Sequence, residues 1–138
     1  MTSVSDGEPR SRAGRHAEMG QEEPPHEIRE RTFAFAVQVI RMVKQFPRTL
    51  DAIEIGRQPL RAATSVGANV EEAHGAESQR DFVHKMGIAC KEVREIRYWL
   101  RLVKATILNN DEAQALFQES DELVRILSTI VAKARKKT

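Results

Sequence analysis

One heptad pattern constrains this chain more than any other feature. Between Phe82 and Ile107, apolar residues recur at alternating spacings of 4 and 3 without a break. The residues of this seam are Phe82, Met86, Ala89, Val93, Ile96, Leu100, Val103 and Ile107. A spacing that averages 3.5 residues places them along one side of a helix, which other helices must cover. The pattern predicts a helix from about Ser78 to Ile107, roughly 45 Å long.

A segment rich in small residues precedes this helix and predicts its closest partner. Its buried face would carry Leu60, Ala63, Val66, Gly67 and Val70. Small side chains allow helix axes to approach more closely than the usual spacing of about 8–10 Å. Because Gly56 and Pro59 interrupt the pattern, the main helix is expected over about 57–73, kinked onto a short turn over 51–55. Thr49 or Asp51 is the expected N-cap.

Two further amphipathic segments complete the pattern. The first is a helix over about 27–46, with a predicted apolar stripe of Phe33, Val37, Ile40 and Val43, widened by Phe35, Val39 and Phe46. The second is a helix over about 111–133, with a seam of Leu116, Leu123, Leu127 and Ile130. Four amphipathic helices with short links predict an all-α fold, an antiparallel up-down-up-down four-helix bundle over residues 27–138.

The N-terminal segment differs in composition from the rest. Residues 1–26 are rich in Ser, Gly, Glu, Arg and Pro and show no apolar periodicity, which predicts a disordered tail whose role the sequence leaves open. No run of about 18 apolar residues is present, so no membrane span is expected. Cys90 is the single cysteine and cannot form an internal disulfide, which favours the reducing cytoplasm.

Candidate chemical sites are few. Glu71 with His74, and Asp81 with His84, have the carboxylate-x-x-His spacing that holds metals in some bundles, but both pairs flank one turn and lack further inward-facing carboxylates. Cys90 follows a seam residue and has no nearby base, so it is interpreted as a partly buried filler. No phosphate-binding glycine loop or zinc-type spacing occurs. We therefore expect no enzyme, no cofactor and no metal.

The two flanks of the long helix differ in kind. One carries Arg94, Arg97, Arg101 and Lys104, and the other carries Ile88, Glu92, Glu95, Trp99 and Leu102. Three interpretations stay open. The flanks can form a solvated face with ordinary charge pairs. They can instead dock head to tail on neighbouring copies, which predicts an oligomer interface of Glu92, Glu95, Trp99 and Leu102 against Arg94, Arg97 and Arg101. The basic flank can also meet nucleic-acid phosphates, together with Lys133, Arg135, Lys136 and Lys137.

The central hairpin also carries a recognisable motif. Its first arm reads Gln58-x-Leu60-Arg61-Ala62-x-x-Ser65-x-Gly67-Ala68-Asn69-x-x-Glu72-Ala73. Its second arm reads Ser78-x-x-Asp81-Phe82-x-x-Lys85-x-x-Ile88-Ala89-x-Lys91-Glu92, followed by Glu95-x-x-Tyr98-Trp99-Leu100. The combination resembles a bacterial four-helix-bundle family first noticed as proteins encoded by intervening sequences in 23S ribosomal RNA genes. Pro59 stands where that family usually has an aliphatic residue.

The resemblance implies a homo-oligomer, a pentameric ring, and no enzyme. In fold the family resembles the accessory proteins of diversity-generating retroelements, which form basic pentameric rings that bind nucleic acid and a reverse transcriptase; fold alone does not transfer function. The expected function is a non-enzymatic, ring-forming bundle that contacts RNA or DNA as an accessory factor in the cytoplasm. The alternative is a structural or protein-binding assembly module with no nucleic-acid partner.

Overall fold

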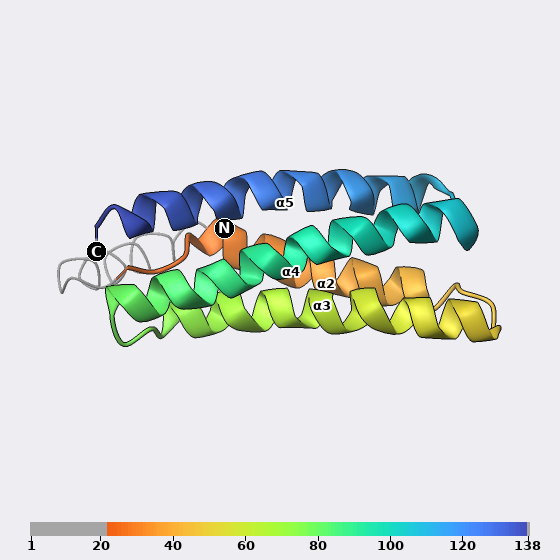
Figure 1. The fold of residues 1–138 in the computed structure, drawn as a ribbon, viewed down its shortest axis with the longest axis horizontal. Coiled ribbons are helices and arrows are strands. Elements are labelled where there is room, and N and C mark those ends of the chain that lie inside the picture. The colour runs from red at the N-terminus through yellow and green to blue at the C-terminus, as the bar shows by residue number, and fades with distance from the viewer. Residues whose placement is uncertain (1–21, 138) are drawn as a thin grey trace, which may run out of the picture.

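Four long helices make up the fold in a computed structural model, which describes residues 22–137. They are α2 (His26–Val43), α3 (Leu50–His74), α4 (Gln79–Thr106) and α5 (Asp111–Arg135). Consecutive helices run antiparallel and side by side, joined by short turns (Figure 1). No strand occurs among the described residues. The predicted all-α, up-down-up-down bundle is confirmed.

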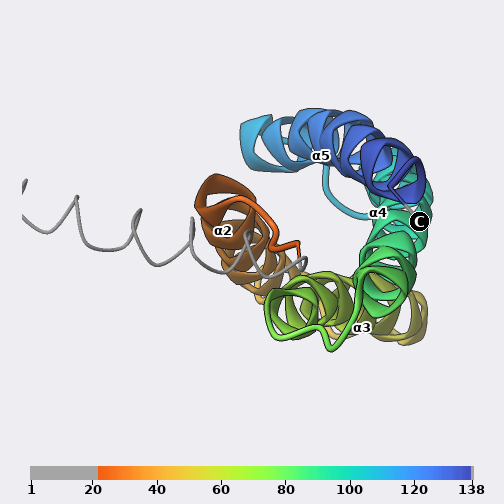
Figure 2. The same ribbon diagram turned by 90° about the vertical axis from the view of Figure 1, so that its left-hand side faces the viewer.

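Each helix packs on its neighbours in the chain. The α3–α4 and α4–α5 pairs share the most extensive contacts, α2 packs mainly on α3, and α2 touches α5 only lightly. Viewed from the end, the helices follow one another around a common centre, and α2 and α5 border its most open side (Figure 2). The bundle is therefore built around the α3–α4 hairpin, as the motif residues suggested.

The α4 seam forms the central wall of the core. Its first seven positions, Phe82 to Val103, are all completely buried, and Ile107 is partly buried at the end of the helix. From α5, Leu116, Leu123 and Leu127 face the same core, while Ile130 is only partly buried. The heptad prediction for α4 is confirmed, because a seam of 3.5-residue period has only one side to bury.

The predicted buried stripe of α2 is only partly correct: Phe35 and Val39, which were expected to widen it, are buried, but its main residues do not lie in the core. Phe33 is 67% exposed and Ile40 is 38% exposed. The buried residues of the helix are Ile28, Thr32, Phe35, Val39 and Met42. Helix α2 carries two apolar stripes. The stripe in the core includes Thr32, and a polar residue at that position makes the stripe look less hydrophobic in the sequence. The Thr32 hydroxyl donates to the Ile28 carbonyl oxygen at 2.9 Å, so its burial leaves the hydroxyl proton bonded.

Helix α3 begins earlier than predicted. It runs from Leu50, with Thr49 as the N-cap, whose hydroxyl accepts from the Ala52 amide at 3.4 Å. Pro59 lies inside this helix and is buried, so the predicted break before residue 57 is wrong. A proline removes one backbone hydrogen bond, and burial of its ring and of the flanking helix offsets that cost. Gly56 allows a close approach, because a Cβ there would lie 3.2 Å from Val43 Cγ1.

The residues just before α2 belong to the folded end of the bundle. Pro24 is buried, and Gln79 donates to a Glu22 carboxylate oxygen at 2.9 Å. Lys137 pairs with the same carboxylate at 3.3 Å. Of the predicted tail, residues 1–21 lie outside the described residues. The last part of the predicted tail is instead ordered, and its Glu22 contacts both Gln79 at the start of α4 and Lys137 just after α5.

Loss of the α4 N-cap should destabilise the hairpin. The Ser78 hydroxyl accepts from the Asp81 amide at 3.0 Å, and the Asp81 carboxylate accepts from the Glu77 amide at 3.2 Å. We expect Ser78→Ala to lower the free energy of unfolding by about 1 kcal/mol, measured by urea denaturation. Ser78→Asn keeps a capping oxygen and should retain most of the stability. An equal loss in both variants would show that the cap contributes nothing.

Candidate nucleic-acid and subunit interface

The basic flank of α4 faces α5 and shares a single aspartate with it. Arg97 donates to Asp121 Oδ1 at 2.7 Å, and Arg125 donates to Asp121 Oδ2 at 3.1 Å. These two hydrogen bonds, the one from Arg97 first, hold the pKa of Asp121 below its usual value. Arg125 also donates to the carboxylate of Glu122, so these two guanidinium groups are paired with two carboxylates. Any excess of positive charge on this flank must come from its other cations.

The other cations of this flank are bound more weakly or not at all. Arg94 donates to the Ser128 hydroxyl at 3.3 Å, which leaves its charge unbalanced. Lys104 donates to Gln114 and lies 4.8 Å above the ring of Phe117. Arg101 is exposed and makes no hydrogen bond or ion pair with residues 22–137. We call Arg94, Arg97, Arg101, Lys104 and Arg125 the α4–α5 basic stripe.

The C-terminal cations do not all join this stripe. Arg135 follows Asp121 and Ser128 at intervals of seven, so it extends the same side of α5 towards the other end of the bundle. Lys137 pairs with Glu22. Lys133 is exposed on another side of α5, and Lys136 is exposed just after the last residue of that helix; neither has an ion pair within the described part of the chain. The predicted group of four therefore separates.

The acidic and aromatic flank of α4 faces α3. Glu95 Oε2 accepts from Arg61 at 3.2 Å and from the Trp99 indole at 2.9 Å. Tyr98 meets Trp99 edge to face at 5.1 Å between ring centroids and is itself 54% exposed. Trp99 is only partly exposed. Glu95 and Arg97 thus each have a partner within their own chain, which the sequence pattern alone did not reveal.

The two remaining interface candidates, Glu92 and Leu102, are also half-buried. Oε1 of Glu92 is buried and has no hydrogen-bond partner among residues 22–137. Leu102 is half-buried on the outer side of α4. A buried carboxylate oxygen without a donor is costly, so a donor outside the isolated chain would stabilise it. Within a subunit, Glu95 on this flank has hydrogen-bond donors, whereas Oε1 of Glu92 has none among residues 22–137.

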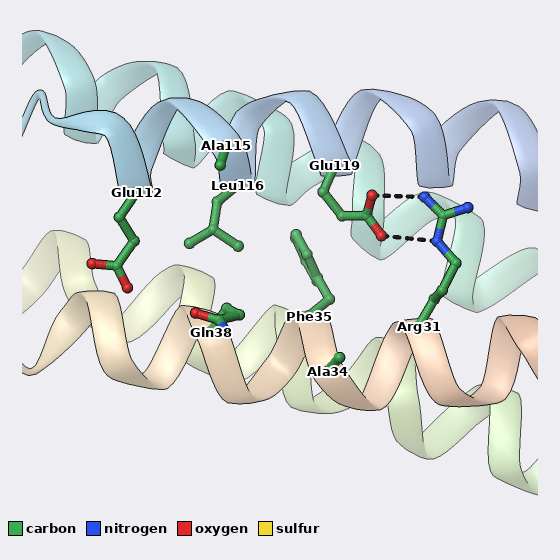
Figure 3. Close-up of a pocket in the computed structure, with 8 residues that line it drawn as sticks. All are labelled: Arg31, Ala34, Phe35, Gln38, Glu112, Ala115, Leu116 and Glu119. Atoms are coloured by element: carbon green, nitrogen blue, oxygen red, sulfur yellow. Dashed lines mark hydrogen bonds and ion pairs between the residues drawn. The ribbon is translucent and has the colours of Figure 1, made fainter.

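A pocket that sequence reasoning missed lies between α2 and α5. Its volume is about 270 Å³, and Phe35 and Leu116 approach each other across it (Figure 3). Arg31 closes one end by donating to both carboxylate oxygens of Glu119, at 3.0 and 2.6 Å. The hydrogen bond to Glu119 raises the pKa of Arg31 above its ordinary value. The pocket is lined by Arg31, Ala34, Phe35, Gln38, Glu112, Ala115, Leu116 and Glu119.

Arg31 and Glu119 neutralise each other, and four of the six other lining residues are apolar, with Gln38 and Glu112 as the polar exceptions. No sequence signal links Arg31 and Glu119, which are 88 positions apart and lie on the outer helices. Only the closure of the bundle brings them together.

The candidate metal and thiol residues have polar neighbours but form no metal cluster among residues 22–137. His74 Nδ1 lies 3.0 Å from Glu23 Oε1. Within residues 22–137, no three His, Cys, Asp or Glu side chains are grouped to hold a metal ion. Cys90 is buried, and its sulfur lies 3.3 Å from the Ser128 hydroxyl.

Across residues 22–137, no helix combines the length and the apolar character needed to cross a bilayer.

Comparison with known proteins agrees with the four-helix fold. The model of the 23S rRNA-intervening sequence protein family matches residues 25–129, which include most of the bundle. A crystal structure of a protein of unknown function from the S23 ribosomal protein family of Bacteroides thetaiotaomicron superposes with a TM-score of 0.70 and 31% identity. The match covers 75% of this chain and 97% of that one. No curated protein matches the sequence. The chain belongs to the 23S rRNA-intervening sequence protein family.

Proposed function

We propose that this protein is a non-enzymatic, ring-forming bundle that contacts RNA or DNA as an accessory factor. The observation that carries the proposal is the α4–α5 basic stripe. Its guanidinium and ammonium groups outnumber the carboxylates that bond them, and Arg101 has no partner in residues 22–137. Arginines spaced along a helix seam suit phosphates, because the planar guanidinium binds two phosphate oxygens at once.

The proposed assembly is a homopentamer in the cytoplasm. The pentamer follows from the family resemblance of the central hairpin, and the cytoplasm suits a buried cysteine thiol that forms no disulfide. A ring would carry one copy of the stripe on each subunit. Once one stripe has bound a nucleic acid, the neighbouring stripes meet it at a high effective concentration, so several weak phosphate contacts raise the total affinity. A reverse transcriptase is one protein partner that such an accessory ring could serve.

The alternative is an assembly module that binds no nucleic acid. The internal pairing of Arg97 with Asp121 and of Glu95 with Arg61 favours it, because those charges already stabilise the subunit. Under this alternative, Arg94 and Arg101 are solubilising residues on a solvated face.

Salt dependence separates these two functions. We expect the purified protein to bind single-stranded RNA at about 50 mM salt, and the affinity to fall steeply as salt rises, with a slope of about −0.7 per phosphate contact. Fluorescence anisotropy with a labelled RNA measures both quantities. A neutral polymer of the same length is the control. No binding at low salt would reject the nucleic-acid function and leave the assembly module.

A further inference from the structure

Bulky exposed apolar side chains gather on one outer side of α2 and α3. Among residues 22–137, the exposed large hydrophobic residues are Phe33, Ile40, Leu50, Ile53 and Tyr98. Four of the five lie on α2 and the first turn of α3. Scattered exposed apolar residues need no explanation, but a group on one face marks an interaction surface.

An ion pair on the surface shows that these residues share a side. Arg29 on α2 pairs with Glu71 on α3 at 3.2 Å across the outside of the two helices. Phe33 and Ile40 follow Arg29 by 4 and 11 residues, which is about one and three helical turns. Ile53 precedes Glu71 by 18 residues, about five turns. We call Phe33, Ile40, Leu50 and Ile53 the α2–α3 apolar face.

We propose that the α2–α3 apolar face of one copy docks on the outer side of α4 of a second copy, with Phe33 packing over Gly87. This inference rests on the proposed ring and assigns its contact surface. Figure 2 shows that α4 lies away from α2, beyond α3, so the two surfaces belong to different sides of the bundle. Two unlike surfaces that meet make a head-to-tail contact, the kind that can close into a ring.

The α4 side offers a matching surface. Tyr98 is 54% exposed, and Leu102 beside it is half-buried. Gly87 precedes Tyr98 by 11 residues, so both lie on the same side of α4. A Cβ at Gly87 would meet nothing within 4 Å, so the isolated chain gives no packing reason for a glycine in mid-helix. Helical glycine is unfavourable, and an approaching neighbour would explain it.

The heights of the two surfaces along the bundle agree. Gly67 stands opposite Thr32, with a Cβ position 3.9 Å from its carbonyl oxygen. By antiparallel counting, Ile40 therefore stands opposite about residue 59 of α3. The Arg61–Glu95 pair then places residue 59 opposite about residue 97 of α4. Ile40 and Tyr98 are thus nearly level.

Equal height means that rotation about an axis parallel to the helices brings the surfaces together without a shift along that axis. A contact of that kind can close into a ring, whereas a shift along the axis would produce a filament. By the same counting, Phe33 stands within one helical turn of the height of Gly87, so the ring of Phe33 can lie over the open glycine.

The size of the surface supports a second copy as the occupant. Helix α2 has 18 residues and is about 27 Å long, and two packed helices are about 20 Å wide. The whole outer face of the two helices over that length, apolar and polar residues together, has a flat area of about 540 Å², which is slightly below the roughly 600 Å² per partner of a small specific interface before side-chain relief is added.

The N-terminal segment is a poorer occupant. Residues 1–21 contain only Val4, Met1 and Met19 as larger apolar residues. The chain enters the bundle at Glu22, beside Gln79 and Lys137, at the end opposite Leu50 and Ile53. Apolar packing over the α2–α3 apolar face therefore requires another molecule.

Charge insertion tests the surface. We expect Phe33→Glu combined with Ile40→Glu to raise the dissociation concentration of the oligomer at least about 30-fold, measured by light scattering after size exclusion. Gln118→Glu, an exposed change on the outer side of α5, should leave the mass unchanged. Circular dichroism must show an intact helical fold in each variant. If the double variant keeps the assembled mass, this surface is rejected while the ring stands. If the wild type is a single chain throughout, the ring fails as well.

Cysteine cross-linking tests the pairing. In a Cys90→Ser background, Phe33→Cys with Gly87→Cys should form a ladder of disulfide-linked chains on oxidation, because a disulfide needs Cα atoms within about 7 Å. Each single cysteine variant should remain uncoupled. Efficient coupling of Phe33→Cys alone would show face-to-face copies and overturn the head-to-tail pairing.

Discussion

Replacing Ile96 with alanine is expected to lower the free energy of unfolding by about 3 kcal/mol. Ile96 is completely buried in the middle of the α4 seam. Truncation removes buried methyl and methylene groups and leaves a cavity that packed neighbours fill only in part. Because α4 packs against both α3 and α5, the cavity would loosen the central wall of the bundle. Urea denaturation should show a lower midpoint with an unchanged slope.

Ile126→Ala is the matched control for this prediction. Ile126 is the same residue type on α5, partly buried at the edge of the same core. It loses less contact on truncation, and it lies away from the surfaces proposed for assembly. We expect a loss of about 1 kcal/mol. Equal losses at the two positions would contradict the placement of the α4 seam at the centre of the core.

The correct prediction for α4 and the incorrect one for α2 have one physical cause. The α4 seam has a single apolar side, so burial has only one solution. Helix α2 offers two apolar sides, and the prediction centred the buried side on Phe33 and Ile40, which the isolated bundle leaves exposed, with the buried Phe35 and Val39 only at its edge. Which side enters the core depends on the rotation of α2 against α3, where Gly56 admits Val43 and Phe46. A pattern within one helix does not contain that information.

The start of α3 was mispredicted for a related reason. Local propensity places a helix break at Pro59, but the burial of Pro59 and of Ala52 in the bundle extends the helix to Leu50. Tertiary packing outweighs the one hydrogen bond that proline removes. The charged flanks of α4 were found from their spacing. Their partners, Asp121 and Arg61, lie 24 and 34 residues away on other helices, beyond the reach of spacing rules.

Charge reversal on the α4–α5 basic stripe is expected to weaken RNA binding about 100-fold or more at low salt. The variant combines Arg94→Glu and Arg101→Glu, two exposed positions with no carboxylate partner in residues 22–137. Each change removes an attractive charge and adds a repulsive one beside the phosphates. Loss of two phosphate contacts should also reduce the salt slope by about 1.4 for a single strand. Anisotropy titrations at several salt concentrations measure both effects.

Lys44→Glu combined with Arg48→Glu controls for net charge. Both residues are exposed at the turn between α2 and α3, away from the stripe, and the change in formal charge is the same. If long-range attraction alone drives binding, the two double variants should lose equal affinity, because only the total charge matters at distances near the Debye length. If the stripe itself contacts phosphates, the control should lose only a few-fold and keep the salt slope of the wild type. Arg94 and Arg101 lie within one helical turn of Tyr98 on the α4 surface proposed for docking, so light scattering must show the wild-type mass in both double variants. With that mass unchanged, equal losses with equal slopes would remove the α4–α5 basic stripe as the binding site.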